Sequence, residues 1–423
     1  MVDKKKILII GGGAAGLYAA VKVAMYGGNT VDVTVIEPND RMGKKLRITG
    51  KGRCNLTNDC DRDTFLANVP TNPRFLYAAI AALTPQDVMA DFEMMGVPLK
   101  VERGRRVFPV SDRAHDVADA LVRTARELGV RFVGGKVSRL LTAVDPKTGQ
   151  SVLSGVACGG REFTADAAIL CTGGCSYPVT GSDGSGYKLA ASVGHTVQPP
   201  VPSLVPLVCA GKTCPAMMGL SLRNVRLTVY DKQKGKVTFE DFGEMLFTHY
   251  GVTGPLVLSA SAHMHDLAQN GAGKYELRID LKPALDEAAL DARILSDFKK
   301  YANKDFINAL GDLLPLKAIE PMVTLSGIDP RKKVNAITRE ERRALCSAIK
   351  CLTLYPTAFR PIAEAIVTKG GVTTSEVNPK TMESKRCRGL YFAGELLDVD
   401  AYTGGFNLQI AFSTANLAAM AVV

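Results

Sequence analysis

Three glycines near the start of the chain form a G-x-G-x-x-G pattern, which is typical of a turn that binds a pyrophosphate. They are Gly11, Gly13 and Gly16. The first permits the tight turn, the second lets backbone approach the phosphates, and the third allows close packing of helix on strand. Glu37 follows at about the 20-residue spacing at which a carboxylate meets ribose hydroxyls, and it would repel a 2′-phosphate. We therefore predict a dinucleotide site whose ligand is not NADP.

The elements that must position this turn can be read from the flanking residues. Residues 7–10 are apolar on both faces, as in a buried parallel strand, and a helix-period pattern follows the glycines. A second strand, "VDVTVIE", covers 31–37 and ends in the acidic residue. Strand, glycine turn, helix and strand together predict an α/β fold with a parallel sheet.

The segment after Glu37 favours FAD over NAD as the dinucleotide. About twenty polar, glycine-rich residues follow without a helical pattern, including "GKKLRITGKGRCNLTN" at 43–58. Such a long loop is uncommon in a compact domain unless it is functional or disordered. Along a bound FAD, the basic side chains of Arg41, Lys44 and Lys45 could meet phosphates. We expect the cofactor to order this loop, although a solvated basic loop is the alternative.

Two later segments also favour a flavin site. An apolar strand at 167–171 runs into Thr172-Gly173-Gly174, and a C-terminal strand runs into "AGELLDVDAYTGG" at 393–405. The second of these would bring Gly394, Glu395 and Asp398 to the ribitol and pyrophosphate. The glycines before the last helix would aim its N-terminus at the flavin pyrimidine, where reduction develops negative charge.

The first and last parts of the chain are therefore expected to build one site, with the middle inserted. The fold class we predict is α/β: a Rossmann-type FAD-binding domain from both chain ends, with an inserted β-barrel-like plus helical domain. Alternating patterns in 136–166 also predict a small antiparallel hairpin layer. The expected segments are the first part of the FAD-binding domain at 1–195, a β-rich substrate domain at 196–282, a helical subdomain at 283–350, and a return of the β-rich and FAD-binding domains at 351–423.

Composition limits the other possibilities. The 423 residues carry a formal net charge of +10, which suits an anionic cofactor or substrate as well as a nucleic acid. No apolar run approaches the ~20 residues that span a bilayer, so we expect a cytoplasmic protein. The ten cysteines form no CxxC pair and no zinc-ligand spacing, so we expect no metal site.

At this point the chain resembles the aminoacetone-oxidase/BaiN-like family of bacterial NAD(P)/FAD-dependent oxidoreductases, which are two-dinucleotide-fold flavoproteins. The resemblance rests on "GGGAAGLYAA", "TGKGRCNLTN", "PVTGSDGSGYKLA", "LFTHYGVTGP" and "AGELLDVDAYTGGFNLQIAFSTA" and covers essentially the whole chain. It implies FAD contacts from Gly11, Gly13, Ala15, Gly16, Glu37, Lys45, Arg53, Asn55, Val137, Thr172, Gly173, Gly394, Asp398 and Asn407. The last helix departs from the family, with "STANLAAMAVV" where a glycine is expected.

Three residues are candidates for the chemistry. Cys54 would lie near the isoalloxazine ring, where it either packs or takes part in redox chemistry. His249 and Tyr250 belong to the insert, before a helix expected from about Gly254. Since the unperturbed pKa of histidine lies near neutrality, His249 is the preferred proton donor or acceptor, with a structural role as the alternative.

The reaction we favour from the resemblance is NAD(P)H-dependent reduction of a conjugated C=C in a steroid-like or bile-acid-like small molecule. No second G-x-G-x-x-G follows a strand, so NADH or NADPH would act as a transient donor without a domain of its own. The alternatives are oxidation of a small amine such as aminoacetone by O2, a flavin-dependent tRNA-modifying protein, and a flavin-binding sensor. We expect a small-molecule substrate and neither a membrane nor a nucleic-acid partner. The oligomeric state does not follow from the sequence.

Overall fold

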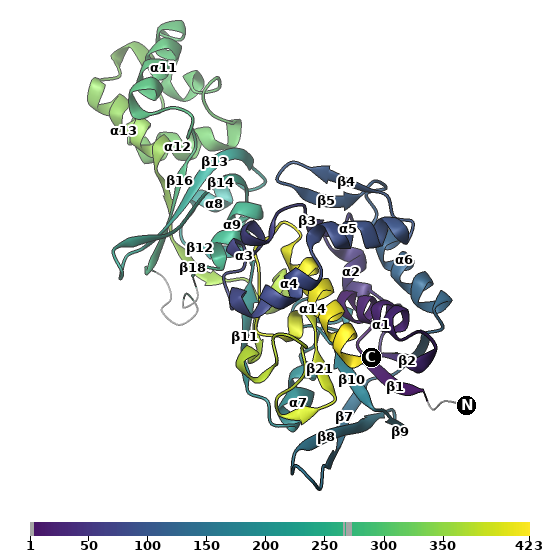
Figure 1. Ribbon diagram of the computed structural model, residues 1–423. Coiled ribbons are helices and arrows are strands. Elements are labelled where there is room, and N and C mark those ends of the chain that lie inside the picture. The colour runs from purple at the N-terminus through teal and green to yellow at the C-terminus, as the bar shows by residue number, and fades with distance from the viewer. Residues whose placement is uncertain (1–3, 265–266, 268–272) are drawn as a thin grey trace. The chain divides into compact units, whose positions relative to one another are not determined.

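A computed structural model describes residues 4–264, 267 and 273–423, and the chain divides into two compact units (Figure 1). The first unit is Met1–Ser203 with Ile362–Val423, and the second is Leu204–Pro361. The first boundary lies after residue 203 and the expected break lies after 195, whereas the second boundary falls within the segment 351–423, where a return of both domains is expected. The reason is a pairing between distant segments: β11 (Val197–Ser203) runs antiparallel to β19 (Val367–Val372), so both strands belong to the first unit.

A five-stranded parallel sheet is the centre of the first unit. Its order is β21-β10-β1-β2-β6. Parallel pairing links every neighbouring pair in this order. The strands are β1 (Lys5–Ile10), β2 (Val31–Glu37), β6 (Arg131–Gly134), β10 (Ala167–Leu170) and β21 (Leu390–Phe392). The predicted α/β class and the contribution of both chain ends to one sheet are confirmed.

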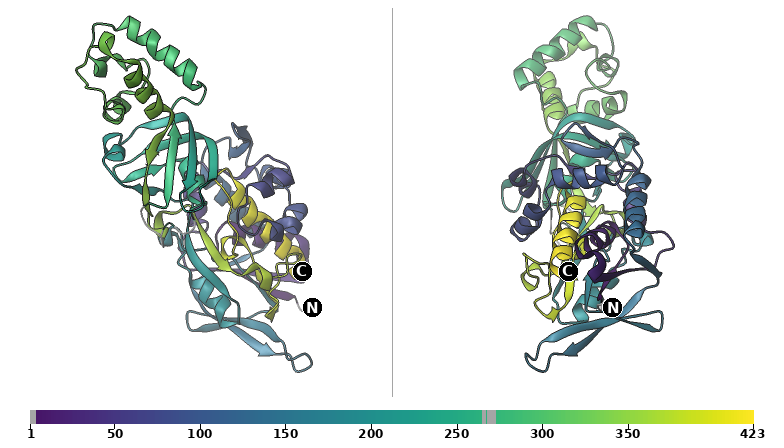
Figure 2. Two further views of the ribbon diagram at one scale, coloured as in Figure 1. Left: turned by 90° about the vertical axis from the view of Figure 1, so that its left-hand side faces the viewer. Right: turned by 45° about the vertical axis from the view of Figure 1, so that its right-hand side comes forward.

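Two helices from opposite ends of the chain pack against each other in this unit. They are α1 (Ala14–Gly27) and α14 (Phe406–Val422), which lie side by side in Figures 1 and 2. Most of α14 is buried around its whole circumference, as expected for a helix without a polar face. It also contacts α4 (Tyr77–Ala82), while α6 (Ala114–Glu127) packs on α1. The unit further contains α3 (Arg62–Ala67), α5 (Pro85–Met94) and α7 (Ser185–Ser192).

Smaller sheets flank the parallel sheet. The predicted hairpin layer is β7 (Val137–Val144), β8 (Ser151–Cys158) and β9 (Arg161–Thr164), paired antiparallel in sequence order. The short strand β20 (Cys387–Arg388) pairs in parallel with the start of β8, on the edge opposite β7. A second small sheet has the order β3-β5-β4. Its strands are β3 (Thr57–Asn58), β4 (Leu99–Glu102) and β5 (Arg106–Pro109).

The second unit is built on a seven-stranded sheet of order β17-β16-β13-β14-β15-β12-β18. Its two edge strands, β17 (Leu352–Leu354) and β18 (Pro356–Phe359), are separated in sequence by Tyr355 alone. Because one continuous segment forms both edges, the sheet must curl back on itself, and the curl is visible in Figure 2. The other strands are β12 (Leu207–Cys209), β13 (Ser221–Asp231), β14 (Lys236–Phe247), β15 (Gly251–Thr253) and β16 (Tyr275–Asp280).

The helical part of the second unit lies where the sequence placed it. It contains α11 (Glu287–Lys300), α12 (Leu316–Ser326) and α13 (Arg339–Lys350), and α8 (Thr213–Ala216) and α9 (Pro255–Ser261) accompany the sheet. A capping box explains the start of α13, since the Thr338 hydroxyl accepts from the Glu341 N–H and the Glu341 carboxylate accepts from the Thr338 N–H. Among the described residues, no helix has the length and apolar character that a membrane span requires.

Candidate functional site

One large cavity in the first unit lies at the carboxyl ends of the parallel strands. Residues at or just after the ends of all five strands line it, as expected for a ligand site in an open α/β sheet. Its open space is about 1360 Å³ when the solvent at its mouth is included, and its wall draws on segments from both ends of the chain. The strand-end residues in its wall are Ile10, Gly11, Ile36, Glu37, Gly135, Cys171, Thr172, Ala393 and Gly394.

The three glycines of the first turn have different structural roles. Gly11 has φ +105°, and a Cβ there would lie 2.6 Å from the carbonyl oxygen of Cys171. A Cβ at Gly16 would lie 1.8 Å from the carbonyl oxygen of Gly11. A Cβ at Gly13 would meet nothing within 4 Å, although Gly13 lines the cavity at the start of α1. Gly11 and Gly16 thus hold the turn, while Gly13 leaves room beside the positive end of a helix, where a pyrophosphate fits.

Glu37 is buried at the end of β2, and its carboxylate accepts three hydrogen bonds. One oxygen accepts from the Gly12 N–H at 2.6 Å. The other accepts from the backbone N–H and the side-chain amide of Asn39, at 2.9 and 2.6 Å. The carboxylate lines the cavity, as a partner of ribose hydroxyls must. Asn39, which also lines the cavity, was not predicted, because an asparagine in a loop is ordinarily a turn residue.

Thr172 and the start of α14 are two further features of the wall. Thr172 lines the cavity, and its hydroxyl oxygen is buried against Gly186 without a hydrogen-bond partner among the described residues. The first turn of α14 enters the wall through Asn407 and Leu408. Its positive end suits the negative charge that a flavin gains on reduction. The donors and open backbone of this cavity therefore fit FAD.

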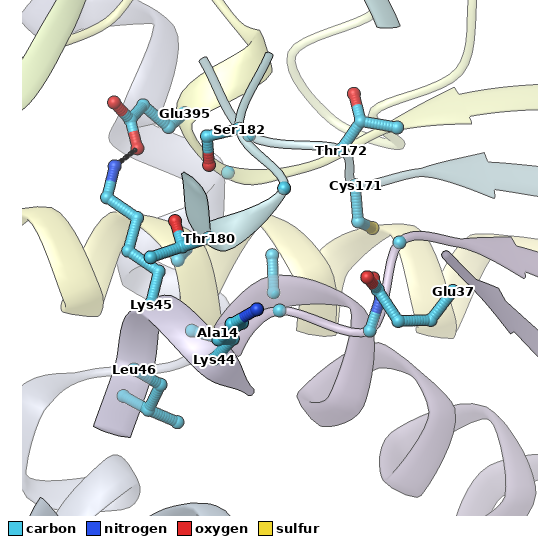
Figure 3. A pocket seen from close by; sticks show the side chains of 18 of the residues that line it. Ala14, Glu37, Lys44, Lys45, Leu46, Cys171, Thr172, Thr180, Ser182 and Glu395 are labelled. Carbon is cyan, nitrogen blue, oxygen red and sulfur yellow. Dashed lines mark hydrogen bonds and ion pairs between the residues drawn. The ribbon is translucent and has the colours of Figure 1, made fainter. Parts of the chain in front are cut away.

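An ion pair crosses one side of the cavity. The ammonium of Lys45 lies 2.6 Å from a carboxylate oxygen of Glu395 and donates to the Ser176 hydroxyl at 2.6 Å. The other oxygen of Glu395 accepts from the Thr368 N–H at 2.8 Å. Figure 3 shows Lys45 and Glu395 pointing toward one another, with Glu37 at the opposite side of the view. Lys45, predicted to touch FAD, therefore lines the cavity with its charge already paired.

Several basic side chains of the segment at 43–58 are paired with acidic side chains of the first unit. The segment contains a short helix, α2 (Lys44–Ile48), which corrects the expectation of a segment without helix. The guanidinium of Arg47 is almost fully buried and donates to Asp119 on α6 at 2.6 Å. Arg53 pairs with both Glu102 and Asp112. These contacts connect the segment to α6 and to the β4–β5 hairpin.

Ten of the fourteen residues predicted to touch FAD line the cavity, and four do not. Those in the wall are Gly11, Gly13, Ala15, Glu37, Lys45, Val137, Thr172, Gly173, Gly394 and Asn407. Of the four outside it, Gly16 is buried in the turn and Arg53 is occupied by its two carboxylates. Asp398 accepts from the side chain of Asn72 at 3.2 Å. Asn55, with its amide oriented to satisfy both ends, accepts from the Gly405 N–H at 3.0 Å and so braces the start of α14.

Cys54 lies outside the cavity wall and is fully buried in the core of the first unit. Burial raises the pKa of its thiol to about 12. A thiol with such a pKa stays protonated at neutral pH and is a poor nucleophile. These surroundings support the packing alternative for Cys54. The protein shields this thiol, whereas the sequence suggested that the flavin ring would.

His249 and Tyr250 lie in the second unit, in the turn between β14 and β15. Their rings meet edge to face with centroids 5.0 Å apart. The guanidinium of Arg360 lies 4.6 Å from the centroid of the Tyr250 ring. His249 is exposed, and the expected helix follows at Pro255–Ser261 with Gly254 as its N-cap. The turn presents an exposed imidazole beside an aromatic ring and a cation, which suits contact with a substrate.

Some wall residues carried no signal in the sequence. Lys136 lines the cavity and pairs with Asp183. Ser182 and Ile366 also line it. A lysine, a serine and an isoleucine in connecting segments are common everywhere, so only their position in the folded chain identifies them. Among the described residues no cluster of three or more His, Cys, Asp or Glu could hold a metal ion.

The fold and the cavity define a Rossmann-type flavoprotein, an FAD-dependent oxidoreductase. The chain belongs to the HI0933-like family: the family described as "HI0933-like protein Rossmann domain" matches residues 5–421. It is also similar in fold to a chain of the Mycobacterium smegmatis Sdh1 complex in the apo form. That likeness has a TM-score of 0.50 at 16% identity and covers 99% of this chain and 68% of the other.

Two kinds of characterised relative align over almost the whole chain. The 3-dehydro-bile acid delta(4,6)-reductase of Clostridium scindens is 32% identical over 418 residues, or 98% of each chain. The ribosomal RNA dihydrouridine synthase of Escherichia coli is 29% identical over 416 residues, covering 98% of this chain and 97% of the relative. That of Haemophilus influenzae is 29% identical over 422 residues, or 98% of each chain. All three organisms are bacteria, and the similarity includes both units.

Proposed function

We propose that this protein is an FAD-dependent reductase that adds hydride to a C=C bond conjugated with a carbonyl group, with NADH or NADPH as the electron donor. The observation that carries the proposal is the cavity at the strand ends, whose wall combines the Gly13 turn, Glu37 and the start of α14. The chemistry of its relatives supports the choice of reaction. A bile acid delta(4,6)-reductase and a dihydrouridine synthase both yield a product with two more hydrogens across a C=C bond.

The residues of the first unit would hold FAD at three places. The backbone at Gly13 and Ala14 would face the pyrophosphate, Glu37 the adenosine ribose, and Asn407 at the start of α14 the flavin. When bound, FAD supplies the hydride chemistry. The side chains of the protein would orient FAD and the substrate, exclude water, and provide a proton for the substrate carbon next to the carbonyl. His249, with Tyr250 beside it, is our candidate for the proton donor from the second unit.

The first candidate substrate is a steroid-like or bile-acid-like small molecule. The relative with this activity is 32% identical, and the alignment covers 98% of each chain, so both units have counterparts in it. A conjugated enone of this kind takes hydride at the carbon remote from the carbonyl and a proton at the carbon next to it. The proposal therefore requires one acidic group near the substrate, the role assigned to His249.

The second candidate substrate is a uridine in ribosomal RNA. Two relatives named ribosomal RNA dihydrouridine synthase and the positive net charge of the chain favour it. The chain has a net charge of +10 and a pI of about 9.0, and phosphate neutralisation dominates RNA binding. The turn between β4 and β5 exposes Arg103 and Arg105. The side-chain amide of Asn58 donates to the carbonyl of Gly104 in this turn and to the carbonyl of Gly404, near the start of α14, at 3.0 Å each. This candidate revises the expectation that nucleic acid is not a partner.

Oxidation of a small amine rests on the family resemblance alone, since none of the three named relatives is an amine oxidase. A flavin oxidase would be bleached by its amine and recoloured by O2, without NAD(P)H. The reductase would be bleached by NADH or NADPH and recoloured by an enone under anaerobic conditions. The two reactions therefore differ in which reagent reduces the flavin.

One experiment tests the reaction and separates the substrates. The purified yellow protein is titrated anaerobically with NADH and NADPH, and the reduced protein is then mixed with a 3-keto-4-ene steroid, unmodified ribosomal RNA, or buffer. We expect NAD(P)H to bleach the flavin and one acceptor to restore its colour, with the reduced product identified by mass spectrometry. Bleaching of the flavin by aminoacetone, but by neither NADH nor NADPH, would overturn the proposal. Restoration by RNA alone would select the second candidate.

A further inference from the structure

The ion pair between Lys45 and Glu395 differs from the other charged groups around the cavity. Both side chains line the wall, with exposed fractions of 23% and 20%. By comparison, Lys136 also lines the wall but its partner Asp183 does not, and these two side chains are 54% and 38% exposed. Charges that lie partly out of water act more strongly on a neighbouring ligand, because the solvent screens them less.

The surrounding backbone fixes this ion pair in one geometry. Glu395 accepts from Ser176 at 3.0 Å and from the N–H of Thr368 at 2.8 Å, in addition to its contact with Lys45. The chain passes close to this carboxylate at Gly174, where a Cβ would lie 3.0 Å from a Glu395 oxygen and 2.4 Å from the Thr368 hydroxyl. A glycine is therefore needed for the approach. The ion pair and its hydrogen-bond partners come from four separate segments of the first unit, which contain Lys45, Ser176, Thr368 and Glu395.

We propose that the Lys45–Glu395 ion pair sets the reduction potential of the bound flavin. Reduction adds negative charge to the ring, so the ammonium of Lys45 favours the reduced form and the carboxylate of Glu395 opposes it. Because the two act with opposite sign, their paired geometry holds the potential between the values that either charge alone would give. The inference rests on the proposed binding of FAD, but not on which substrate is reduced.

The test measures the flavin midpoint potential by equilibration with a reference dye, without substrate. Lys45→Met leaves the carboxylate unneutralised, so the equilibrium should shift toward oxidised flavin by at least tenfold, about 30 mV for a two-electron couple. Glu395→Gln should shift it by a similar factor in the opposite direction. The double variant should lie between the two single variants. Lys300→Met is the matched control, since Lys300 forms an exposed ion pair with Asp312 outside the cavity wall, and it should leave the potential within a fewfold of the parent.

Shifts of the same sign in both single variants, or FAD-loaded variants with the parent potential, would overturn the proposal. If Lys45→Met loses FAD, Glu395→Gln still decides the question. An unshifted potential in that variant would make Lys45 a cofactor-binding residue only. Failure of the proposed function gives a different result. If the two single variants bind FAD and shift the potential in opposite directions, but the parent protein reduces neither enone nor RNA, the role of the ion pair stands and the proposed substrates are wrong.

Discussion

The backbone N–H of Gly12 donates to the carboxylate of Glu37 at 2.6 Å, which joins the first glycine turn to the end of the second strand. The acidic residue thus does more than face a ribose, because it also fixes the turn that precedes α1. The turn and the carboxylate are adjacent in space although they are 25 residues apart in sequence. Substitutions in the turn or at Glu37 should therefore change both the affinity for FAD and the stability of the local fold. Measuring FAD binding and thermal stability separately distinguishes the two effects.

Gly13→Val should abolish FAD binding while leaving the fold intact. Gly13 has φ −81° and ψ −165°, which valine can adopt, and a Cβ would meet nothing within 4 Å. The added methyls would occupy the space that a pyrophosphate needs. Absorbance at the flavin band and thermal melting of the apo-protein check both points. Gly16→Ala is the contrasting variant: its Cβ would clash with Gly11, so it should lower the melting temperature.

Glu37→Gln should weaken FAD binding about tenfold to a hundredfold, corresponding to about 1.5–3 kcal/mol for hydrogen bonds to a charged group. The new amide would also direct one of its N–H groups at the backbone N–H of Gly12 or of Asn39. The hydrogen bond that the carboxylate accepts from that N–H would then be lost. Titration of apo-protein with FAD gives the dissociation constant. Asn39→Ala separates the loop contribution from that of the ribose contact. An unchanged constant in Glu37→Gln would place the ribose elsewhere.

Lys22→Met should destabilise the first unit by about 3–5 kcal/mol, the usual cost of leaving a buried charge unpaired. Lys22 lies 2.7 Å from Asp91, and the two side chains are 8% and 10% exposed. The Tyr18 hydroxyl also donates to Asp91 and would compensate part of the loss. Urea unfolding at neutral pH measures the effect. Adding Asp91→Asn to Lys22→Met should recover part of the stability. A double variant that is less stable to urea than Lys22→Met would contradict this explanation.

Thiol labelling of the native protein should modify Cys351 rapidly and leave Cys54 unmodified. Cys351 is exposed, whereas Cys54 is fully buried and burial raises its pKa to about 12. Because protein atoms bury Cys54, removing FAD should not make it reactive. Labelling with an aromatic disulfide, followed by peptide mass spectrometry, identifies the modified residues. Cys54→Ser should keep hydride transfer and lose about 1–3 kcal/mol of stability from a buried hydroxyl. Loss of turnover in a folded variant would show a redox role.

Stability should fall in acid in two steps. Burial lowers the pKa of His195, although the Glu376 carboxylate opposes this. The unfolded chain, with a histidine pKa of about 6.5, then binds the proton more readily, so stability is full above that pH and declines below it. Despite desolvation, hydrogen bonds from Arg386 and Thr196 lower the pKa of Glu376 to about 2, so its contribution is lost between about pH 4.3 and pH 2. Thermal melts across this range should show both declines, and His195→Gln should remove the first.

The features predicted well from the sequence are those set by neighbouring residues. The turn at Gly11 to Gly16 and the strand ending at Glu37 follow from local pattern, and both lie where expected. Helix α2 was missed, because its five residues are flanked by glycines and are held by Arg47 reaching Asp119, 72 residues away. Arg53 was predicted to meet FAD, but two carboxylates that pattern could not locate take up its charge.

The Lys45–Glu395 pair could not be foreseen for the same reason, since 350 residues separate its members. The first boundary lies after residue 203 and not after 195, because β11 pairs with β19 on the far side of the insert and so belongs to the first unit. Sequence patterns thus located the strands and turns that surround the cavity. They did not show which charges neutralise one another within it.

The second unit begins and ends at neighbouring points. The N–H of Arg360, close to its end, donates to the carbonyl of Pro206, close to its start, at 3.0 Å. A stretch whose ends meet in this way can be exchanged between homologues by recombination without lengthening the host chain or breaking its sheet. Such an exchange would replace one contiguous piece of the gene and leave the cavity residues, which are encoded on both sides of it, unchanged.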